Sequence, residues 1–413
     1  MDVAVIGLGK LGLPLAALLA SSGNRVKGYD LLGSVRESIR DRSFNSQEPG
    51  LESLLNQDIS LEIVDDIGAT VKDVEIVFII VPTPSLESGH FSNQHLLSAV
   101  TEVAKSIEKS QRIVVDIVST VMPGSCEGPI KEALESGSGR KIGSSLGLCY
   151  NPEFIALGSV IKDMQYPDMH LIGESSHWAG AVVEQALKSI VKINPPVRKM
   201  KLKEAELVKI AVNNYVTMKI SYANSLMQGS VRLGGVDIDV VTDAIGLDSR
   251  IGNKYLKAAA PYGGPCFPRD TRALNALYKD LGLSDSLSQA TEEINGAHAD
   301  FVADLVTGRV ETGAKIGIVG LSYKVGTSVV EDSPGLAIAN SIKSRGFQVI
   351  FWDDEGAEIE IESPDSLTKD ASHFISLADF IVITRNLKDP VLFTNLLKIS
   401  EKPYFDLWRE IKY

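Results

Sequence analysis

The residues best suited to covalent chemistry lie in the stretch 262–270, which reads Tyr-Gly-Gly-Pro-Cys-Phe-Pro-Arg-Asp. Glycines let a backbone or a ligand approach closely, and Pro268 suits the first turn of a helix because its missing N–H needs no partner there. Cys266 is therefore expected just before a helix N-terminus, where partial positive charge favours a thiolate. The stretch alone leaves two interpretations open: a nucleophile with the Asp270 carboxylate nearby, or a small buried residue in a tight turn.

A lysine and an amide form a second candidate pair. Lys209 and Asn213 lie four residues apart in the segment 202–232, which has no proline and is predicted to form one long helix. The spacing places them on one helix face, within a mostly apolar stripe. Such a pair either reaches solvent at the edge of the stripe or points at something polar, and the pattern by itself favours the first.

The N-terminal residues are typical of a dinucleotide-binding turn. An apolar strand is predicted at 3–6, a glycine-rich turn follows, and a helical pattern begins at Pro14. The glycines permit close approach of a pyrophosphate, and a second strand at 25–30 ends in Asp30, which would bind the ribose of NAD and repel the 2′-phosphate of NADP. The alternative is a turn of the same shape without a ligand. The predicted cofactor contacts here are Gly7, Gly9, Lys10, Leu11, Gly12 and Asp30.

Further strands are predicted at 75–81, 112–118 and 146–151. Doubly wound sheets bind cofactors at the carboxyl ends of their strands, so the residues that follow these strands are candidates. Glu153 is either an acid or base or a carboxylate that caps a turn. The candidates are Pro82, Thr83, Ser119, Thr120 and Glu153.

The rest of the chain suggests a helical middle and a second nucleotide-binding half. Pro195 and Pro196 mark the clearest break, and helices are predicted at 236–245 and 269–281. A strand–glycine–turn unit at 315–324 lacks a full dinucleotide fingerprint but carries a lysine, which favours a mononucleotide. We therefore expect an α/β protein with two Rossmann-like, doubly wound parallel-sheet domains joined by an all-helical domain. The expected bounds are 1–196 for the NAD domain, 197–298 for the helical domain and 299–413 for the second nucleotide domain.

Composition fits soluble globular domains. The chain has 413 residues, 44% hydrophobic and 23% charged, with a formal net charge of −12. The acidic balance argues against a nucleic-acid partner, and three cysteines do not suit a disulfide framework. We expect no signal segment, no membrane partner, a cytoplasmic location and no metal site. Cys126 and Cys149 are expected to be ordinary buried thiols.

Motifs along the chain carry a resemblance to a known family. They are GLGKLG at 7–12, VPTP at 81–84, STVMPG at 119–124, NPEF at 151–154, KIAVNN at 209–214, DSRIGNKYLK at 248–257, YGGPCFPRD at 262–270 and GLSYK at 320–324. In this order they resemble the UDP-glucose/GDP-mannose 6-dehydrogenases, a family of nucleotide-sugar dehydrogenases, over essentially the whole chain. The UDP-glucose enzymes are the nearest type within it.

The resemblance implies a reaction. Family members use two NAD+ in succession to oxidise the C6 hydroxyl of a nucleotide-linked hexose to a carboxylate. Cys266 would attack the C6 aldehyde to form a thiohemiacetal, a second hydride transfer would give a thioester, and water would hydrolyse it. The helix at 202–232 would be the core of a homodimer, with Arg250 reaching the neighbouring subunit's site.

The resemblance also implies roles for the remaining candidates. Lys209 and Asn213 would hold the C6 oxygen, Asp270 would orient water and the lysine, Thr120 would position water, and Glu153 would act as acid or base. The implied substrate contacts are Glu153, Phe154, Leu157, Lys209, Asn213, Arg250, Tyr255, Lys257, Gly263, Phe267, Tyr323, Lys324 and Arg409.

Some positions depart from the family pattern. Leu157 stands where many relatives have a glutamate, Glu331 stands where an arginine is usual, and the ending 405–409 differs from the common Asp-Gly-Arg form. The sugar nucleotide stays open among UDP-glucose, GDP-mannose, UDP-galactose and UDP-N-acetylhexosamines, and NPEF favours UDP-glucose. Two other classes remain: a β-hydroxyacid dehydrogenase of the 6-phosphogluconate type, which lacks a nucleophilic cysteine, and a non-catalytic regulatory protein that binds nucleotide sugars.

Overall fold

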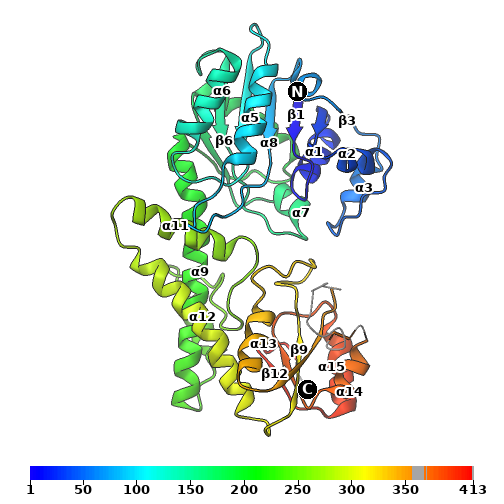
Figure 1. Cartoon of the computed structure of the whole chain (residues 1–413), viewed down its shortest axis with the longest axis vertical. Coiled ribbons are helices and arrows are strands. Elements are labelled where there is room, and N and C mark those ends of the chain that lie inside the picture. The colour runs from blue at the N-terminus through cyan, green and yellow to red at the C-terminus, as the bar shows by residue number, and fades with distance from the viewer. Residues whose placement is uncertain (356–366, 369, 412–413) are drawn as a thin grey trace. The chain divides into compact units, whose positions relative to one another are not determined.

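The computed structural model describes residues 1–355, 367–368 and 370–411. They form an N-terminal unit, Met1–Ala211, and a C-terminal unit, Val212–Tyr413 (Figure 1). The boundary falls inside the long helix α9 (Leu202–Leu233), which confirms the single helix predicted at 202–232. The expected division into three domains stays a prediction.

The N-terminal unit is built on an eight-stranded sheet in the order β3-β2-β1-β4-β5-β6-β7-β8. The first six strands of this order are mutually parallel, β7 is antiparallel to β6, and β8 is parallel to β7. The strands are β1 (Asp2–Ile6), β2 (Arg25–Tyr29), β3 (Leu61–Ile63), β4 (Ile76–Ile79), β5 (Ile113–Ile117), β6 (Leu146–Tyr150), β7 (His170–Glu174) and β8 (Val197–Met200).

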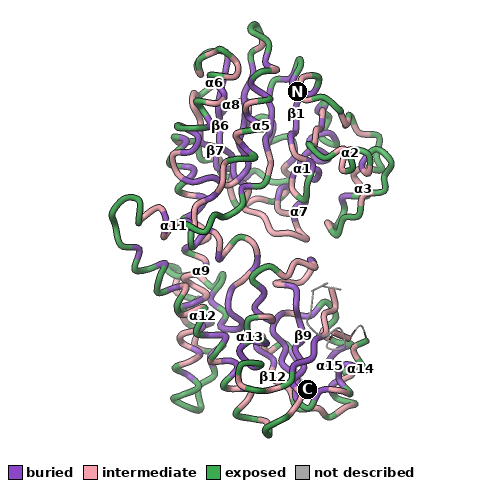
Figure 2. Tube along the Cα trace, in the orientation of Figure 1, coloured by how far each residue is buried: buried purple, intermediate pink, exposed green. Residues whose placement is uncertain are grey.

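Helices cover both faces of this sheet, which is why its central strands are apolar except for Asp116 on β5. Every residue of β4 and β5 is buried, as expected for parallel strands covered on both faces. In Figure 2 the neighbouring strands β1 and β6 are drawn largely in the buried colour. Val114 packs in the core that holds α1, α7 and α8, and Val115 packs in the core that holds α5 and α6. The helices are α1 (Gly12–Ser21), α2 (Gly33–Arg40), α3 (Leu51–Leu55), α4 (Ile67–Val71), α5 (Gln94–Ser106), the π-helix η1 (Cys126–Ile130), α6 (Lys131–Ser138), α7 (Val160–Gln165) and α8 (His177–Ile190).

Asp116 is an unusual residue for the middle of such a strand. It lies on β5 between Phe78 and Cys149 of the neighbouring strands and is 0% exposed. Neither oxygen of its carboxyl group has a hydrogen-bond partner among the residues that the structure describes. Burial, together with the charge of Glu153, raises the pKa of Asp116 well above its usual range. The carboxyl group is therefore held in its neutral form.

Replacing Asp116 with valine is expected to raise the free energy of unfolding by about 1–3 kcal/mol, the cost of an unsatisfied buried polar group. The pKa of Asp116 is higher in the folded protein than in the unfolded chain, where it is near 3.8. Its contribution to the free energy of unfolding is therefore most favourable below pH 3.8, and it is lost as the pH rises through the pKa of the folded state. The difference in the free energy of unfolding between the valine variant and the wild type, measured by urea unfolding, should therefore grow from pH 5 to pH 8. Asp116→Asn is the matched control, because it removes the charge but keeps an unpartnered polar group. A valine variant less stable than the wild type would contradict the account.

The C-terminal unit combines helices with a four-stranded parallel sheet in the order β10-β9-β11-β12. One face of the sheet packs with α12 and α13, and the other packs with α14 and α15. The elements are α10 (Ile238–Gly246), α11 (Phe267–Asp280), α12 (Ser286–Thr307), β9 (Lys315–Val319), α13 (Pro334–Ser344), β10 (Gln348–Trp352), α14 (Ala371–Leu377), β11 (Phe380–Ile383), α15 (Pro390–Ser400) and β12 (Tyr404–Asp406). The predicted α/β class, with two parallel-sheet regions and a helical middle, is confirmed.

Candidate active site

The turn after β1 has the shape that a dinucleotide needs. Gly7 has φ +93°, and a Cβ there would lie 2.1 Å from the Ile80 carbonyl oxygen, while a Cβ at Gly12 would lie 1.8 Å from the Gly7 oxygen. A Cβ at Gly9 would meet no atom within 4 Å, so open space adjoins that glycine. Among the described residues no side chain caps the start of α1, so the partial positive charge of this helix N-terminus can attract a phosphate.

Asp30 lies beside this turn, as predicted. Its Oδ2 accepts a hydrogen bond from the Leu8 N–H at 2.8 Å, and its Oδ1 accepts one from the Leu32 N–H at 2.9 Å. The carboxylate therefore ties the end of β2 to the glycine turn, where the adenosine ribose of NAD would bind. These residues fit the cofactor, with the turn and helix N-terminus for its pyrophosphate and Asp30 for its ribose.

The loops that follow β4 and β5 are joined by side-chain hydroxyls. The Ser119 hydroxyl donates to the Val81 carbonyl at 2.7 Å and accepts from the Val81 N–H at 2.8 Å. The Thr83 hydroxyl donates to the Thr120 carbonyl at 2.7 Å. Thr83 and Ser119 thus fix the backbone that carries Thr120, and Pro82 lies within the same joined pair of loops.

A buried glutamate anchors the Thr120 loop to α9. Glu206 is 0% exposed, and its carboxylate accepts hydrogen bonds from the Gly124 N–H at 2.5 Å and the Cys126 N–H at 2.7 Å. Burial raises the pKa of Glu206, while the two N–H groups oppose the shift. The sequence prediction did not include it, although an acid in the apolar stripe of a long helix, three residues before Lys209, was a usable signal.

Lys209 and Glu153 meet in the N-terminal unit. The Lys209 Nζ donates to the Glu153 carbonyl oxygen at 2.7 Å and lies 4.7 Å from the centroid of the Phe154 ring. Burial raises the pKa of the Glu153 carboxyl to about 7, and the Lys209 ammonium only partly offsets it. A carboxyl that titrates near neutral pH is suited to general acid–base work.

The C-terminal unit contains the remaining catalytic candidates. The Asn213 Nδ2 donates to Asp270 Oδ2 at 2.6 Å, the Arg269 Nε donates to Asp270 Oδ1 at 3.1 Å, and Asp270 is 0% exposed. Cys266 is exposed and directly precedes α11, with Pro268 in the first turn. The predicted place of Cys266 at a helix N-terminus is confirmed, and Cys126 and Cys149 are both buried.

Two glycines let the C-terminal sheet region approach the Cys266 turn. A Cβ at Gly263 would lie 2.0 Å from the Asp332 carbonyl oxygen, and a Cβ at Gly264 would lie 2.4 Å from the Tyr323 ring. Burial raises the pKa of Tyr323 to about 12, with a smaller contribution from the nearby Cys266 sulfur. The predicted substrate residues Gly263 and Tyr323 therefore lie beside the candidate nucleophile, and Lys324 follows them in the chain.

The other predicted substrate residues fall into separate places. Arg409 pairs with Asp239 at 2.6 Å and donates to the Ala258 carbonyl at 2.5 Å, which places it beside the backbone of Lys257. Tyr255 packs edge-on against Phe267, with ring centroids 6.3 Å apart. Arg250 is bound in an exposed pair with Asp248, and Leu157 packs against the first core of the N-terminal unit.

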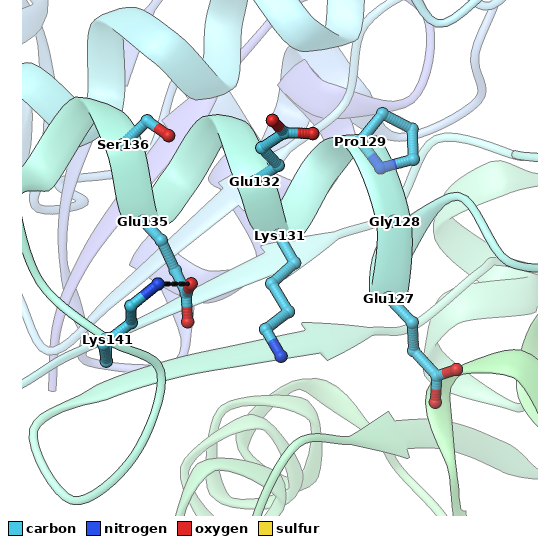
Figure 3. Close-up of a pocket in the computed structure, with 8 residues that line it drawn as sticks. All are labelled: Glu127, Gly128, Pro129, Lys131, Glu132, Glu135, Ser136 and Lys141. Atoms are coloured by element: carbon cyan, nitrogen blue, oxygen red, sulfur yellow. Dashed lines mark hydrogen bonds and ion pairs between the residues drawn. The ribbon is translucent and has the colours of Figure 1, made fainter.

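A shallow depression of about 650 Å³ lies beside η1 and α6 in the N-terminal unit (Figure 3). Charges of both signs line it, and Lys141 pairs with Glu135 at 2.6 Å. No predicted site residue lines it, so we assign it no ligand. Its lining residues are Glu127, Gly128, Pro129, Lys131, Glu132, Glu135, Ser136 and Lys141.

Within residues 1–355, 367–368 and 370–411, no group of three or more His, Cys, Asp and Glu side chains is arranged to hold a metal ion. In that part of the chain, no helix has both the length and the apolar character needed to cross a bilayer.

Comparisons with known proteins agree along the chain. Residues 1–191 match the NAD-binding domain, and residues 203–297 the central domain, of the UDP-glucose/GDP-mannose dehydrogenase family. A UDP-glucose 6-dehydrogenase of Haloferax volcanii is 30% identical over 87% of this chain and 84% of its own. A GDP-mannose 6-dehydrogenase of Pseudomonas aeruginosa is 29% identical over 86% of this chain and 81% of its own. The solved UDP-glucose dehydrogenase of Pyrobaculum islandicum superposes with a TM-score of 0.87 at 30% identity, over 100% of this chain and 94% of that one.

Proposed function

The chain belongs to the UDP-glucose/GDP-mannose dehydrogenase family, and we propose that it oxidises C6 of a UDP-linked glucose to the carboxylate by way of a Cys266 thioester. As a member of this family, it is an NAD-dependent oxidoreductase of nucleotide sugars. The proposal of a thioester mechanism rests mainly on the exposed Cys266 at the start of α11. Four residues later lies the buried Asp270, whose carboxylate accepts a hydrogen bond of 2.6 Å from the Asn213 side chain.

In the proposed reaction, each of the two oxidations transfers one hydride and releases one proton. NAD+, when bound, supplies the hydride acceptor for each oxidation. Glu153 accepts the proton of the C6 hydroxyl in the first step. The Cys266 sulfur bonds to the resulting aldehyde carbon, and the proton of the thiol passes to the aldehyde oxygen to give a thiohemiacetal. The thiohemiacetal then loses its C6 hydride to a second NAD+ and its hydroxyl proton to water, and becomes a thioester.

Water completes the reaction. Its oxygen bonds to the thioester carbon and the C–S bond breaks. One water proton returns to the Cys266 sulfur, the other passes to solvent, and the carboxylate product is released. Lys209 and Asn213, one helical turn apart on α9, are the groups proposed to stabilise negative charge on the C6 oxygen. Thr120 is proposed to position the water, and Asp270 to orient both the water and Lys209.

UDP-glucose is the proposed substrate, and the relatives leave the alternatives in place. The similar proteins include UDP-glucose 6-dehydrogenases and GDP-mannose 6-dehydrogenases at comparable identity. The NPEF motif at 151–154 favours the UDP-glucose type. GDP-mannose, UDP-galactose and UDP-N-acetylhexosamines are the other sugar nucleotides to test.

We also propose a homodimer through α9. Large apolar side chains lie exposed along this helix, among them Leu207, Tyr215 and Tyr222, and a stripe of that kind is typical of a covered interface. The exposed Arg250 would then reach the partner's site. Light scattering should give the mass of a dimer, and a monomeric mass at micromolar concentration would contradict the proposal.

One assay separates the proposed function from its alternatives. NADH formed per sugar nucleotide consumed is measured with UDP-glucose, GDP-mannose, UDP-galactose and UDP-N-acetylhexosamines in turn. We expect two NADH per UDP-glucose. One NADH would indicate a simple alcohol dehydrogenase, and none with any sugar would indicate a binding protein.

A further inference from the structure

The backbone that leads into Cys266 is buried but has no regular secondary structure. In residues 258–262, the three alanines are at most 6% exposed and Tyr262 is 7% exposed. Buried N–H and C=O groups need hydrogen-bond partners. Since no strand in the described part of the chain pairs with this segment, other groups must serve as its hydrogen-bond partners.

Two asparagines act as those partners. Asn224 on α9 accepts from the Ala259 N–H at 2.9 Å and donates to the Ala260 carbonyl at 3.1 Å. Asn295 on α12 accepts from the Tyr262 N–H at 2.8 Å and donates to the Tyr262 carbonyl at 3.0 Å. Each primary amide thus pairs with one donor and one acceptor of the segment, as a neighbouring strand would.

A buried histidine completes the set. His298 on α12 is 0% exposed, and its Nε2 lies 2.8 Å from the Ala259 carbonyl oxygen. A carbonyl oxygen only accepts, so Nε2 carries the proton, and Nδ1 faces the Gln228 amide at 3.3 Å. The ring stacks on Phe301 with a centroid distance of 5.7 Å. Burial lowers the pKa of His298, which keeps it neutral.

We call Asn224, Asn295 and His298 the clamp. The segment that the clamp holds ends at Tyr262, four residues before Cys266. The Tyr262 ring packs edge-on against Phe267, with centroids 6.5 Å apart. Tyr262 and Phe267, which lie on either side of Cys266 in the chain, are therefore in contact. Asn295 holds the backbone N–H and C=O of Tyr262. Displacement of Tyr262 would be transmitted to the thiol.

We propose that the clamp positions the Cys266 thiol for attack on the aldehyde carbon. The inference rests on the proposed function, because only the second oxidation needs the sulfur. The first hydride leaves the alcohol before any bond to Cys266 forms. Loss of the clamp should therefore slow the second half of the reaction and let the aldehyde escape.

Asn295→Ala is the first test. Because a displacement of about 1 Å at a reacting group costs about 100-fold in rate, kcat for the full reaction should fall by about that factor. The KM for the sugar nucleotide and the first hydride transfer, measured as a single-turnover burst, should change by less than about 3-fold. NADH per sugar should fall from two towards one, with the aldehyde captured by a hydroxylamine reagent. Gln289→Ala, an exposed change on the same helix, is the matched control and should leave all of these unchanged.

A second pair of variants guards against simple misfolding. The side-chain nitrogen of glutamine occupies the place of Nε2 in histidine, so His298→Gln should keep the bond to the Ala259 carbonyl and retain two NADH per sugar. His298→Leu fills similar space without a donor and should release aldehyde. A common loss of activity in both His298 variants, with two NADH per sugar retained, would overturn the proposal.

Amide hydrogen exchange tests the clamp apart from the proposed function. Exchange at Tyr262, whose N–H donates to Asn295, should rise in Asn295→Ala and stay unchanged in Gln289→Ala, whichever sugar the enzyme takes. Unchanged exchange in Asn295→Ala would show that the clamp does not hold the segment. A wild-type protein that forms no NADH while the variants show raised exchange would sink the proposed function instead.

Discussion

Replacing Cys266 with serine is expected to abolish steady-state NADH formation, with a loss of at least about 1000-fold. An alcohol at this position ionises far less readily than a thiol, and the ester it would form is a poorer acyl intermediate than a thioester. The first oxidation does not use the sulfur, so a burst of one NADH per site should remain, and any slow turnover after it should release the aldehyde at one NADH per sugar. Stopped-flow measurement of NADH with UDP-glucose separates the burst from turnover.

Cys149 provides the control for this substitution. Cys149 is fully buried, and burial raises the pKa of its thiol well above the usual range, which makes it a poor nucleophile. Cys149→Ala should retain two NADH per sugar even if it unfolds at a lower temperature. Full turnover in Cys266→Ser would remove the covalent mechanism.

Replacing Lys209 with methionine is expected to lower kcat by about 100- to 1000-fold, the usual cost of losing one group that stabilises a developing oxyanion. Methionine keeps the length of the aliphatic stem in the apolar stripe of α9. The Lys209 ammonium also opposes the effect of burial on Glu153. Without it, the pKa of Glu153 should rise from its value of about 7, so the acidic limb of the kcat profile should move to higher pH.

Lys203 offers a matched control on the same helix. Its side chain is 61% exposed and lies 3.4 Å from Glu127, an exposed pair of a kind that contributes little. Lys203→Met should change kcat by less than about 2-fold. A Lys209→Met variant whose kcat stays within 10-fold of the wild type would contradict the proposal that Lys209 stabilises charge in the reaction.

Local signals predicted the elements that carry the site. The glycine turn, the length of α9 and the place of Cys266 each depend on residue types within a few positions of one another, through turn chemistry, helix periodicity and the proline at a helix start. The strands at β1, β2, β4, β5 and β6 could be predicted for the same reason, because buried apolar runs mark them in the chain.

The contacts that hold the site could not be predicted this way. Glu206 reaches backbone about 80 residues away, and Asn295 reaches Tyr262 from another helix, so neither partner is visible in a local pattern. The sequence also contains no sign that β7 runs antiparallel to β6, since strand direction follows from tertiary packing. Asp116 reads as a polar interruption in an apolar run, although the strand buries it completely.

A buried ion cluster in the C-terminal unit bears on how the protein responds to heat. Asp353 follows β10 as Asp30 follows β2, and its Oδ2 accepts from the Leu321 N–H at 2.6 Å. Arg385, only 3% exposed, pairs with Asp353 at 3.1 Å and with Asp354. The hydration of charged groups becomes less favourable as temperature rises, so the cost of removing this cluster from water falls on warming. Its net contribution to the stability of the second sheet is therefore smallest in the cold and grows toward the unfolding transition.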